Sequence, residues 1–251
     1  MKGEVFLEMR GIRKSFGSNE VLRGVDLDIY RGETLALLGG SGGGKSVLMK
    51  HMVGLLQPDE GTVTLEGRPI SGCDERQLAW ARRKISMMFQ SGALFDSMTV
   101  RENIAFPLRE GGIKDETEID KRVHEALEIV KLPGQENKMP ADLSGGMRKR
   151  VALARAVVEK PMCVLYDEPH AGLDPVTGDS IDHLIRALAR DHGITNVVVT
   201  HEMRSVFRIA TRIIFMKDGR IYWEGTGDEL QVSKDPVLKN FIEGRSEDSD
   251  L

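Results

Sequence analysis

The octapeptide Gly39–Ser46 (GGSGGGKS) most constrains how this chain can fold. It fits G-x-x-x-x-G-K-[S/T] and lies between an apolar run, Thr34–Leu38, and a segment of helical spacing, Lys45–Leu55. In that context, glycines let backbone N–H groups converge on phosphate at a helix N-terminus, which favours anions. The pattern predicts a nucleotide-binding loop rather than an ordinary glycine-rich turn, with Lys45 on the β- and γ-phosphates and Ser46 on Mg²⁺. The expected nucleotide contacts are Gly39, Gly40, Ser41, Gly42, Gly43, Gly44, Lys45, Ser46 and Val47.

Two acidic residues follow a second apolar run, Met162–Tyr166. A buried strand there would deliver Asp167 to the Mg²⁺ shell, and Glu168 could then polarise a water for in-line attack on phosphate. Such a pair taken alone is more often a solvated helix start. Its position downstream of the phosphate loop favours the catalytic interpretation.

The rest of the chain alternates between short apolar runs and segments of helical spacing, which predicts a mostly parallel sheet covered on both faces. Strand patterns are missing from residues 91 to 143, so we expect a helical subdomain inserted there. The sequence shows no internal repeat, which indicates a single nucleotide cassette. Strands are expected at Val5–Met9, Val25–Ile29, Thr62–Leu65, Ile85–Phe89, Asn196–Thr200, Arg212–Met216 and Arg220–Glu224, and helices at Glu75–Arg83, Val100–Leu108, Glu116–Val130, Ser144–Val158 and Thr177–Arg190.

Composition excludes several classes of protein. The formal net charge of −4 disfavours nucleic-acid binding, which usually brings a basic excess. The two cysteines, Cys73 and Cys163, show neither disulfide nor zinc spacing, which is typical of a reducing cytoplasm. Charges interrupt the N-terminal segment, and no apolar run approaches the ~18 residues of a membrane span, so we expect neither a signal peptide nor a transmembrane helix. The basic clusters Arg82–Lys84 and Arg148–Arg150 are expected to be solvated helix faces rather than membrane-binding surfaces.

Leu143–Met147 (LSGGM) resembles the signature motif of the ABC ATPase superfamily, which likewise precedes the acidic strand. A serine and two glycines at this point would open a helix and present N–H donors to a phosphate. The resemblance implies that Ser144, Gly145, Gly146 and Met147 contact ATP held by a second subunit, within a head-to-tail homodimer that encloses two ATP molecules. Ser144 would serve as an ordinary N-cap at the same time.

The resemblance covers nearly the whole chain, and further motifs follow in the family's order. Gln90 matches the glutamine that contacts Mg²⁺ or the attacking water and senses the permease. Asp174 matches the aspartate that links the two sites across the dimer, and His201 matches the switch histidine on the γ-phosphate. Phe16 resembles the aromatic residue that stacks on adenine, although a phenylalanine between strands is often part of the core. The implied catalytic set is Glu168, His201, Gln90 and Lys45, with Ser46, Gln90 and Asp167 around Mg²⁺.

The implied fold is α/β: a P-loop NTPase with an ABC ATPase core, a mostly parallel sheet, an N-terminal antiparallel β subdomain and an inserted helical subdomain. We expect a single ABC ATPase domain over residues 1–245. In it, residues 1–90 and 144–245 form the RecA-like core with the antiparallel β subdomain, and residues 91–143 form the helical subdomain. Residues 246–251 are expected to be a polar C-terminal tail.

Three stretches look like the ATPases of Mla/Mce lipid-transport systems: Gly42–Leu48, Gln90–Leu108 and Ser144–Ala156. Met147 stands where solute importers more commonly carry glutamine. The resemblance implies ATP-driven movement of phospholipid or another apolar lipid between the inner membrane and an Mce-domain protein, which in Gram-negative bacteria serves outer-membrane lipid asymmetry. The implied partners are an integral inner-membrane permease, the Mce-domain protein and an accessory subunit, with this chain bound peripherally at the cytoplasmic face.

Three alternatives remain. The cargo could be a polar solute delivered by a periplasmic binding protein. A soluble ABC ATPase acting on DNA or ribosomes would need a coiled-coil insertion or tandem cassettes, and a non-hydrolysing regulatory module would not need Glu168 and His201 intact. His170 departs from the threonine that many cassettes carry, and it could either affect water positioning beside Glu168 or pack in the interior.

Overall fold

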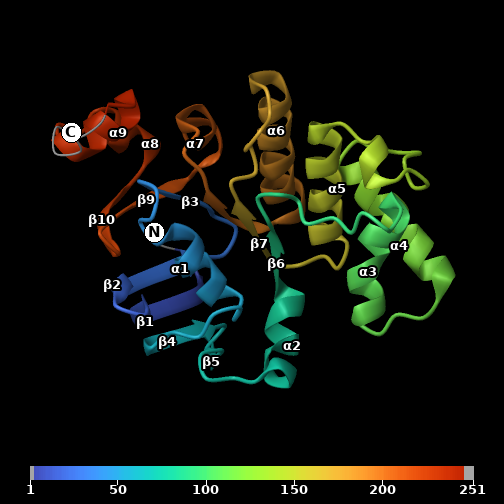
Figure 1. Cartoon of the computed structure of the whole chain (residues 1–251), viewed down its shortest axis with the longest axis horizontal. Coiled ribbons are helices and arrows are strands. Elements are labelled where there is room, and N and C mark those ends of the chain that lie inside the picture. Colours follow the sequence, from blue (N-terminus) through green and yellow to red (C-terminus); the bar gives the residue numbers. More distant parts are fainter. Residues whose placement is uncertain (1–2, 246–251) are drawn as a thin grey trace. The chain divides into compact units, whose positions relative to one another are not determined.

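The structure is a computed structural model that describes residues 3–245 (Figure 1). The chain divides into two compact units, one made of residues 1–74 and 199–251 and the other of residues 75–198. The polar tail expected at residues 246–251 lies outside the described residues. None of the helices described here is both long and apolar enough to cross a membrane.

The first unit combines an antiparallel sheet with a part of the nucleotide-binding core. Its antiparallel sheet has the order β2-β1-β4-β5, and a second group of strands has the order β10-β9-β3. Strands β3 and β9 run parallel, with Leu37 opposite Ile214, and β9 and β10 form the expected antiparallel hairpin. The elements are β1 (Val5–Phe16), β2 (Asn19–Tyr30), β3 (Thr34–Gly39), α1 (Lys45–Met52), β4 (Glu60–Leu65), β5 (Arg68–Pro69), α7 (Met203–Ile209), β9 (Arg212–Lys217), β10 (Arg220–Gly225), α8 (Gly227–Gln231) and α9 (Pro236–Glu243).

Three predicted elements of this unit have the wrong length. The strands expected at Val5–Met9 and Val25–Ile29 are parts of a long hairpin, because pairing continues through register shifts that interrupt the alternation of apolar residues. The helix expected at Lys45–Leu55 ends at Met52, and Gly54 then takes a φ of 71°. The other predicted strands and helices are present, with boundaries that differ by one or two residues.

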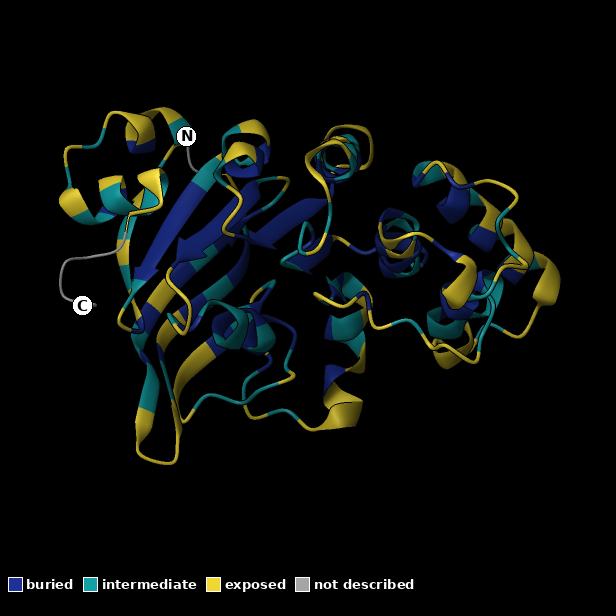
Figure 2. Cartoon of the chain, turned by 45° about the horizontal axis from the view of Figure 1, so that its top comes forward, coloured by how far each residue is buried: buried dark blue, intermediate teal, exposed yellow. Residues whose placement is uncertain are grey.

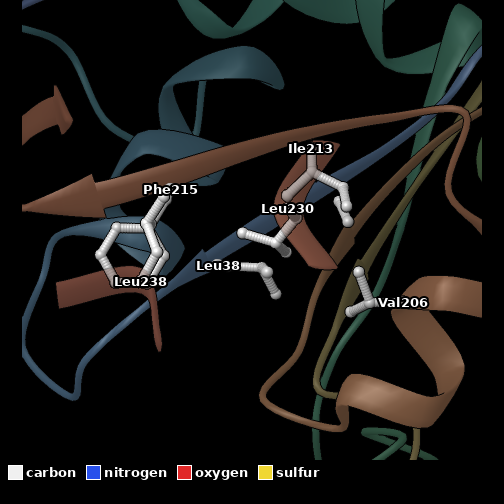
Figure 3. Close-up of a cluster of buried hydrophobic side chains, with 7 residues drawn as sticks. Leu38, Val206, Ile213, Phe215, Leu230 and Leu238 are labelled. Carbon is white, nitrogen blue, oxygen red and sulfur yellow. The ribbon is translucent and has the colours of Figure 1, made fainter. Parts of the chain in front are cut away.

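Three C-terminal helices that the sequence analysis missed help to build the core around β3. Leu38 of β3 and Phe215 of β9 form a buried cluster with Val206 of α7, Leu230 of α8 and Leu238 of α9 (Figure 3). Every residue of β3 is buried, so the strand that leads into the phosphate loop is held firmly. Local signals for α9 were present in the sequence: Asp235 as N-cap, Pro236 at the first position and Gly244 at the end.

The second unit carries three strands and most of the helices. Its strands have the order β8-β7-β6, with β6 and β7 parallel. All of β8 is buried, as are the first four residues of β7; buried strands are dark blue in Figure 2. The elements are α2 (Glu75–Lys84), β6 (Ile85–Met88), α3 (Val100–Glu110), α4 (Glu116–Ile129), a 3-10 turn (Pro140–Asp142), α5 (Gly145–Val157), β7 (Cys163–Asp167), α6 (Pro175–His192) and β8 (Thr195–Val199), whose last residue lies at the boundary between the units.

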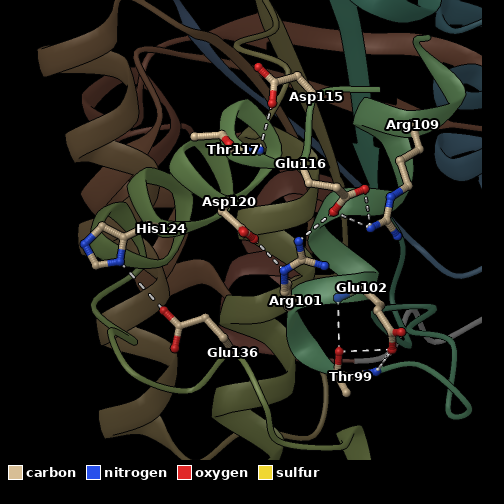
Figure 4. Close-up of polar contacts among 10 residues, drawn as sticks. All are labelled: Thr99, Arg101, Glu102, Arg109, Asp115, Glu116, Thr117, Asp120, His124 and Glu136. Atoms are coloured by element: carbon tan, nitrogen blue, oxygen red, sulfur yellow. Dashed lines mark hydrogen bonds and ion pairs between the residues drawn. The ribbon is translucent and has the colours of Figure 1, made fainter. Parts of the chain in front are cut away.

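Helices α3, α4 and α5 lie side by side in this unit (Figure 1). Between residues 91 and 143, all of which the structure describes, there is no strand, as the sequence predicted. Arg101 of α3 forms ion pairs with Glu116 at 2.7 Å and Asp120 at 2.5 Å in α4, and Thr99 and Glu102 form a capping box at the start of α3 (Figure 4). Because the carboxylates of these ion pairs are exposed, they set the orientation of the helices more than their stability.

Candidate functional site

The loop between β3 and α1 has the geometry that phosphate binding requires. Gly39 ends β3 with a φ of 139°, and a Cβ there would lie 2.2 Å from the carbonyl oxygen of Met216. Gly44 caps α1 with a φ of 90°, and its Cβ would lie 2.8 Å from Cδ2 of Leu22. Both ends of the loop therefore accept only glycine, and the backbone between them is free to surround an anion at the helix N-terminus.

The Lys45 side chain turns back over this loop. Its ammonium donates to the carbonyl oxygens of Gly39 and Gly40, at 2.8 Å each. The Gly43 N–H also donates to the Gly40 carbonyl at 3.2 Å, so the loop is compact. A lysine ammonium at the positive end of the α1 dipole makes a strong site for a polyphosphate.

We predict that Gly39→Ala destabilises the protein by about 2 kcal/mol or more, because alanine is strained at this φ and its Cβ collides with backbone. Thermal unfolding should show a lower Tm, and equilibrium titration with a fluorescent ATP analogue should show weaker binding. Gly40→Ala is the matched control for stability, because a Cβ at Gly40 would meet nothing within 4 Å. An unchanged Tm in Gly39→Ala would contradict the prediction.

A hollow of about 290 Å³ lies beside the loop. It is lined by Phe16, Asn19 and Val21 of the antiparallel sheet and by loop and helix residues from Gly42 to Val47. Phe16 is 49% exposed, so it does not belong to the hydrophobic core. An aromatic ring at the rim of a phosphate-binding loop can stack on a nucleotide base.

His201 is exposed and follows β8, directly before helix α7. The first unit therefore holds the phosphate loop, Phe16 and His201. The second unit holds the remaining predicted site residues: Gln90, Ser144, Gly145, Gly146, Met147, Asp167, Glu168 and Asp174.

The acidic pair lies at the carboxyl end of β7, as predicted. Asp167 is the last residue of the strand, and Glu168 follows with a φ of 48°. That left-handed conformation costs a non-glycine residue roughly 1 kcal/mol or more, and such strain occurs preferentially at functional sites. The Ala171 N–H donates to the Glu168 carbonyl at 3.1 Å, so a tight turn fixes the backbone there.

His170 in that turn contacts helix α6. Its Nε2 lies 2.7 Å from Oδ1 of Asp182, and the two side chains are 9% and 3% exposed. The ring therefore links the turn after Glu168 to α6. Of the two interpretations open at the sequence level, the buried contact favours packing.

The signature motif opens helix α5. Ser144 is its N-cap, and its Oγ accepts from the Met147 N–H at 3.3 Å. Ser144 and Gly145 are exposed, and the first N–H groups of a helix have no acceptor within the helix. Gly146 is buried, and a Cβ there would lie 2.4 Å from Cγ2 of Thr177 in α6. Thr177 was not among the predicted site residues, because only the packing of α5 on α6 brings it to the motif.

Asp174 caps helix α6. Its Oδ1 accepts from the Val176 and Thr177 N–H groups at 3.0 Å each, and the Thr177 hydroxyl donates to Oδ2 at 2.5 Å. The Thr177 hydroxyl and these backbone donors hold the pKa of Asp174 below its usual value. Asp174 therefore stays ionised, and Thr177 joins it to the signature helix.

Lys149 corrects one prediction. The cluster Arg148–Arg150 was expected to be a solvated face, but Lys149 is only 6% exposed. Its ammonium donates to the carbonyl oxygen of Gln90 and, at 3.4 Å, to that of Glu168. Burial lowers the pKa of Lys149, and the charges of Glu168 and Asp167 oppose that shift. The helical spacing of the buried residues Gly146, Leu153 and Ala156 would have placed Lys149 on the inner side of α5.

The chain carries residues of the chemical types that bind Mg²⁺. A serine hydroxyl (Ser46) and a carboxylate (Asp167) supply the hard oxygen donors that this ion prefers. Mg²⁺ in such sites keeps waters and phosphate oxygens, so the protein needs to contribute only one or two ligands. Among the residues that the structure describes, no group of three or more His, Cys, Asp or Glu side chains could hold a metal ion by itself.

The buried strand, glycine-bounded loop and lysine-bearing helix define a P-loop NTPase. Residues 22–171 match the ABC transporter family, and the chain belongs to that family. It is 40% identical to Protein Trigalactosyldiacylglycerol 3, chloroplastic, of Arabidopsis thaliana, over 96% of this chain and 74% of the relative. It is 41% identical to the probable ribonucleotide transport ATP-binding protein mkl of Mycobacterium leprae (96% and 70%) and 42% identical to the methionine import ATP-binding protein MetN of Brucella abortus (96% and 62%).

A dimeric ATP-binding cassette in a post-hydrolysis state, bound to ADP and Pi, has the same fold. Its TM-score is 0.81 at 34% identity, over 88% of this chain and 98% of the other. The α/β P-loop fold with an antiparallel N-terminal sheet and a helical insertion is thereby confirmed. The protein is an ATP-hydrolysing subunit of an ABC transporter.

Proposed function

We propose that this ATPase energises the transport of phospholipid or a related apolar lipid between the inner membrane and an Mce-domain protein, for outer-membrane lipid asymmetry. The observation that carries the proposal is the stretch from Gln90 to Leu108, together with Met147, which resembles the Mla/Mce ATPases. The plant relative, which bears the name of a galactolipid and aligns with 96% of this chain, supports a lipid cargo.

A solute importer is the second candidate. The relative from Brucella abortus is named for methionine import and that from Mycobacterium leprae for ribonucleotide transport, and both are as similar to this chain as the plant protein is. The sequence of the ATPase subunit therefore distinguishes these cargoes only weakly, because the cargo contacts the permease and not the ATPase.

The proposed working unit is a head-to-tail homodimer of single-domain chains, with the domain reaching residue 245. Each γ-phosphate is held between Lys45 of one subunit and Ser144–Gly146 of the other. The N-terminus of α5 supports this role, because Ser144 and Gly145 are exposed there and a helix N-terminus favours an anion. ATP then closes the dimer, and its loss allows the dimer to open.

For hydrolysis, we assign Glu168 as the general base and His201 as the group that stabilises charge developing on the γ-phosphate. Gln90 orients the attacking water, and Asp174 links the two sites of the dimer. Ser46, Asp167 and Gln90 would hold Mg²⁺, which neutralises phosphate charge when bound. Phe16 stacks on the adenine.

A groove of about 390 Å³ beside the segment Gln90–Ala93, here called the Q loop, is the proposed contact for the permease. Phe95 and Phe106 lie in it with ring centroids 4.9 Å apart, and Phe95 is exposed. Exposed aromatic rings in a groove suit an incoming helix. The subunit would thus sit peripherally on the cytoplasmic face of the inner membrane. The groove is lined by Ser86, Met87, Phe89, Ala93, Phe95, Phe106, Pro107, Arg155, Ala156 and Glu159.

Affinity purification of the tagged full chain from detergent-solubilised membranes of its own cells tests the cargo. We expect recovery of an integral permease, an Mce-domain protein, an accessory subunit and phospholipid, identified by mass spectrometry. Recovery of a permease with a sugar- or amino-acid-binding protein, and no enriched lipid, would overturn the lipid assignment in favour of the second candidate.

A further inference from the structure

One side chain of helix α5, that of Lys149, contacts both the Q loop and the turn that begins at Glu168. The Lys149 ammonium donates to the carbonyl of Gln90, which follows strand β6, and to the carbonyl of Glu168, which follows strand β7. The strands β6 and β7 are parallel neighbours, with Met88 opposite Tyr166, so these carbonyls follow adjacent strand ends of one sheet. Lys149 therefore bridges the backbone at the proposed water-orienting residue and at the proposed base.

A second cation of the same helix binds the Q loop alone. Arg155 donates to the carbonyls of Gly92 and Ala93, at 2.8 and 2.7 Å. These residues have φ values of 78° and 46°, so the loop backbone follows a tightly turned path there. Arg155 and Lys149 thus hold the same loop, but only Lys149 also reaches the residue that carries the proposed base.

Stability does not account for a lysine at this position. Its ammonium donates to two neutral carbonyl oxygens, and burial lowers its pKa more than the nearby charges of Glu168 and Asp167 raise it, so the charged form remains costly to desolvate. An unbranched apolar side chain of similar length would fill the space without that cost. A cation here therefore points to a role in the reaction rather than in folding.

We propose that Lys149 is a positioning residue for ATP hydrolysis, which holds the backbone of Gln90 and Glu168 in one arrangement and joins both to the signature helix. This inference rests on the roles proposed above for Glu168 and Gln90. The backbone of Glu168 is strained, and small displacements of a base matter in catalysis, so a contact to its carbonyl in addition to the turn would help to hold it in place. Lys149 lies in the second turn of the helix that Ser144 caps, so this side chain joins the helix of the signature motif to the residue proposed as the base.

The test compares Lys149→Met with Lys149→Arg and with Arg155→Met in the purified full chain. We expect Lys149→Met to lower kcat by about tenfold or more, with an ATP dissociation constant within about twofold of the wild type and no fall in Tm. Lys149→Arg keeps the cation and should recover most of kcat. Arg155→Met removes only Q-loop contacts, so its loss of kcat should be clearly smaller.

A double variant separates this proposal from the assignment of the base. If Lys149 acts through Glu168, adding Lys149→Met to Glu168→Gln should cause no further loss of turnover. If Lys149→Met lowers the turnover of Glu168→Gln by as much as it lowers that of the wild type, the positioning role is overturned. It is also overturned if kcat of Lys149→Met lies within twofold of the wild type, or if kcat falls only in proportion to the folded fraction. Normal turnover in Glu168→Gln alone would instead refute the base itself.

Discussion

Glu168→Gln is expected to lower ATP turnover by about a hundredfold or more and to leave ATP binding intact. The amide has nearly the size of the carboxylate, so the turn after β7 should form unchanged. It cannot accept the proton of the attacking water, and the reaction loses its general base. Phosphate release at saturating ATP measures the loss, and titration with an ATP analogue measures the retained affinity.

The same variant should accumulate a closed dimer in the presence of ATP and Mg²⁺. Binding of ATP drives closure, and without hydrolysis only the dissociation of ATP reverses it. Size-exclusion chromatography with and without ATP should show this shift. Glu128→Gln, in the exposed part of α4, makes the same chemical change away from the site and should hydrolyse ATP like the wild type. Turnover by Glu168→Gln at the wild-type rate would refute the assignment.

The phosphate loop could be predicted from sequence because its requirements are local. Gly39 and Gly44 have conformations and neighbours that exclude every other residue, so the glycines appear in the sequence as a pattern. The helix pair at residues 100–130 was found for a similar reason: its apolar residues recur at helical spacing, and Thr99 and Asp115 cap the two helices. Where backbone conformation, helical spacing or a helix cap determines the residue type, the sequence alone is enough to predict the local structure.

The contacts between elements could not be predicted in this way. Helical spacing places Lys149 on the inner side of α5, but only the packing of that helix shows that its ammonium donates to the carbonyls of Gln90 and Glu168. Thr177 touches Gly146 although 31 residues separate them in the chain, and neither position carries a local signal for the contact. The bulged hairpin β1–β2 was predicted too short, because register shifts break the alternation on which strand prediction depends.

The proposed head-to-tail dimer leads to a second prediction with a large effect: two variants that are inactive alone should recover ATP hydrolysis when they are mixed. Lys45→Ala removes the ammonium of the phosphate loop and should abolish tight ATP binding. Ser144→Asp keeps a good N-cap for α5 but places a negative charge against the phosphate of the partner's ATP, so it should bind ATP and fail to hydrolyse it. Each variant alone should show almost no phosphate release.

In a mixed dimer, one site combines both defects and the other site has the wild-type Lys45 and Ser144. Random exchange makes about half of the dimers mixed, so turnover should return to about a quarter of the wild-type rate. A chain carrying both substitutions is the control: mixed with the wild type, it leaves no complete site in any mixed dimer and should lower turnover. Full activity of Ser144→Asp alone would show that hydrolysis does not need the signature serine, and a mixture as inactive as its two components would refute the exchange of residues between subunits. Either result would remove the reason for placing the signature motif on the partner's nucleotide.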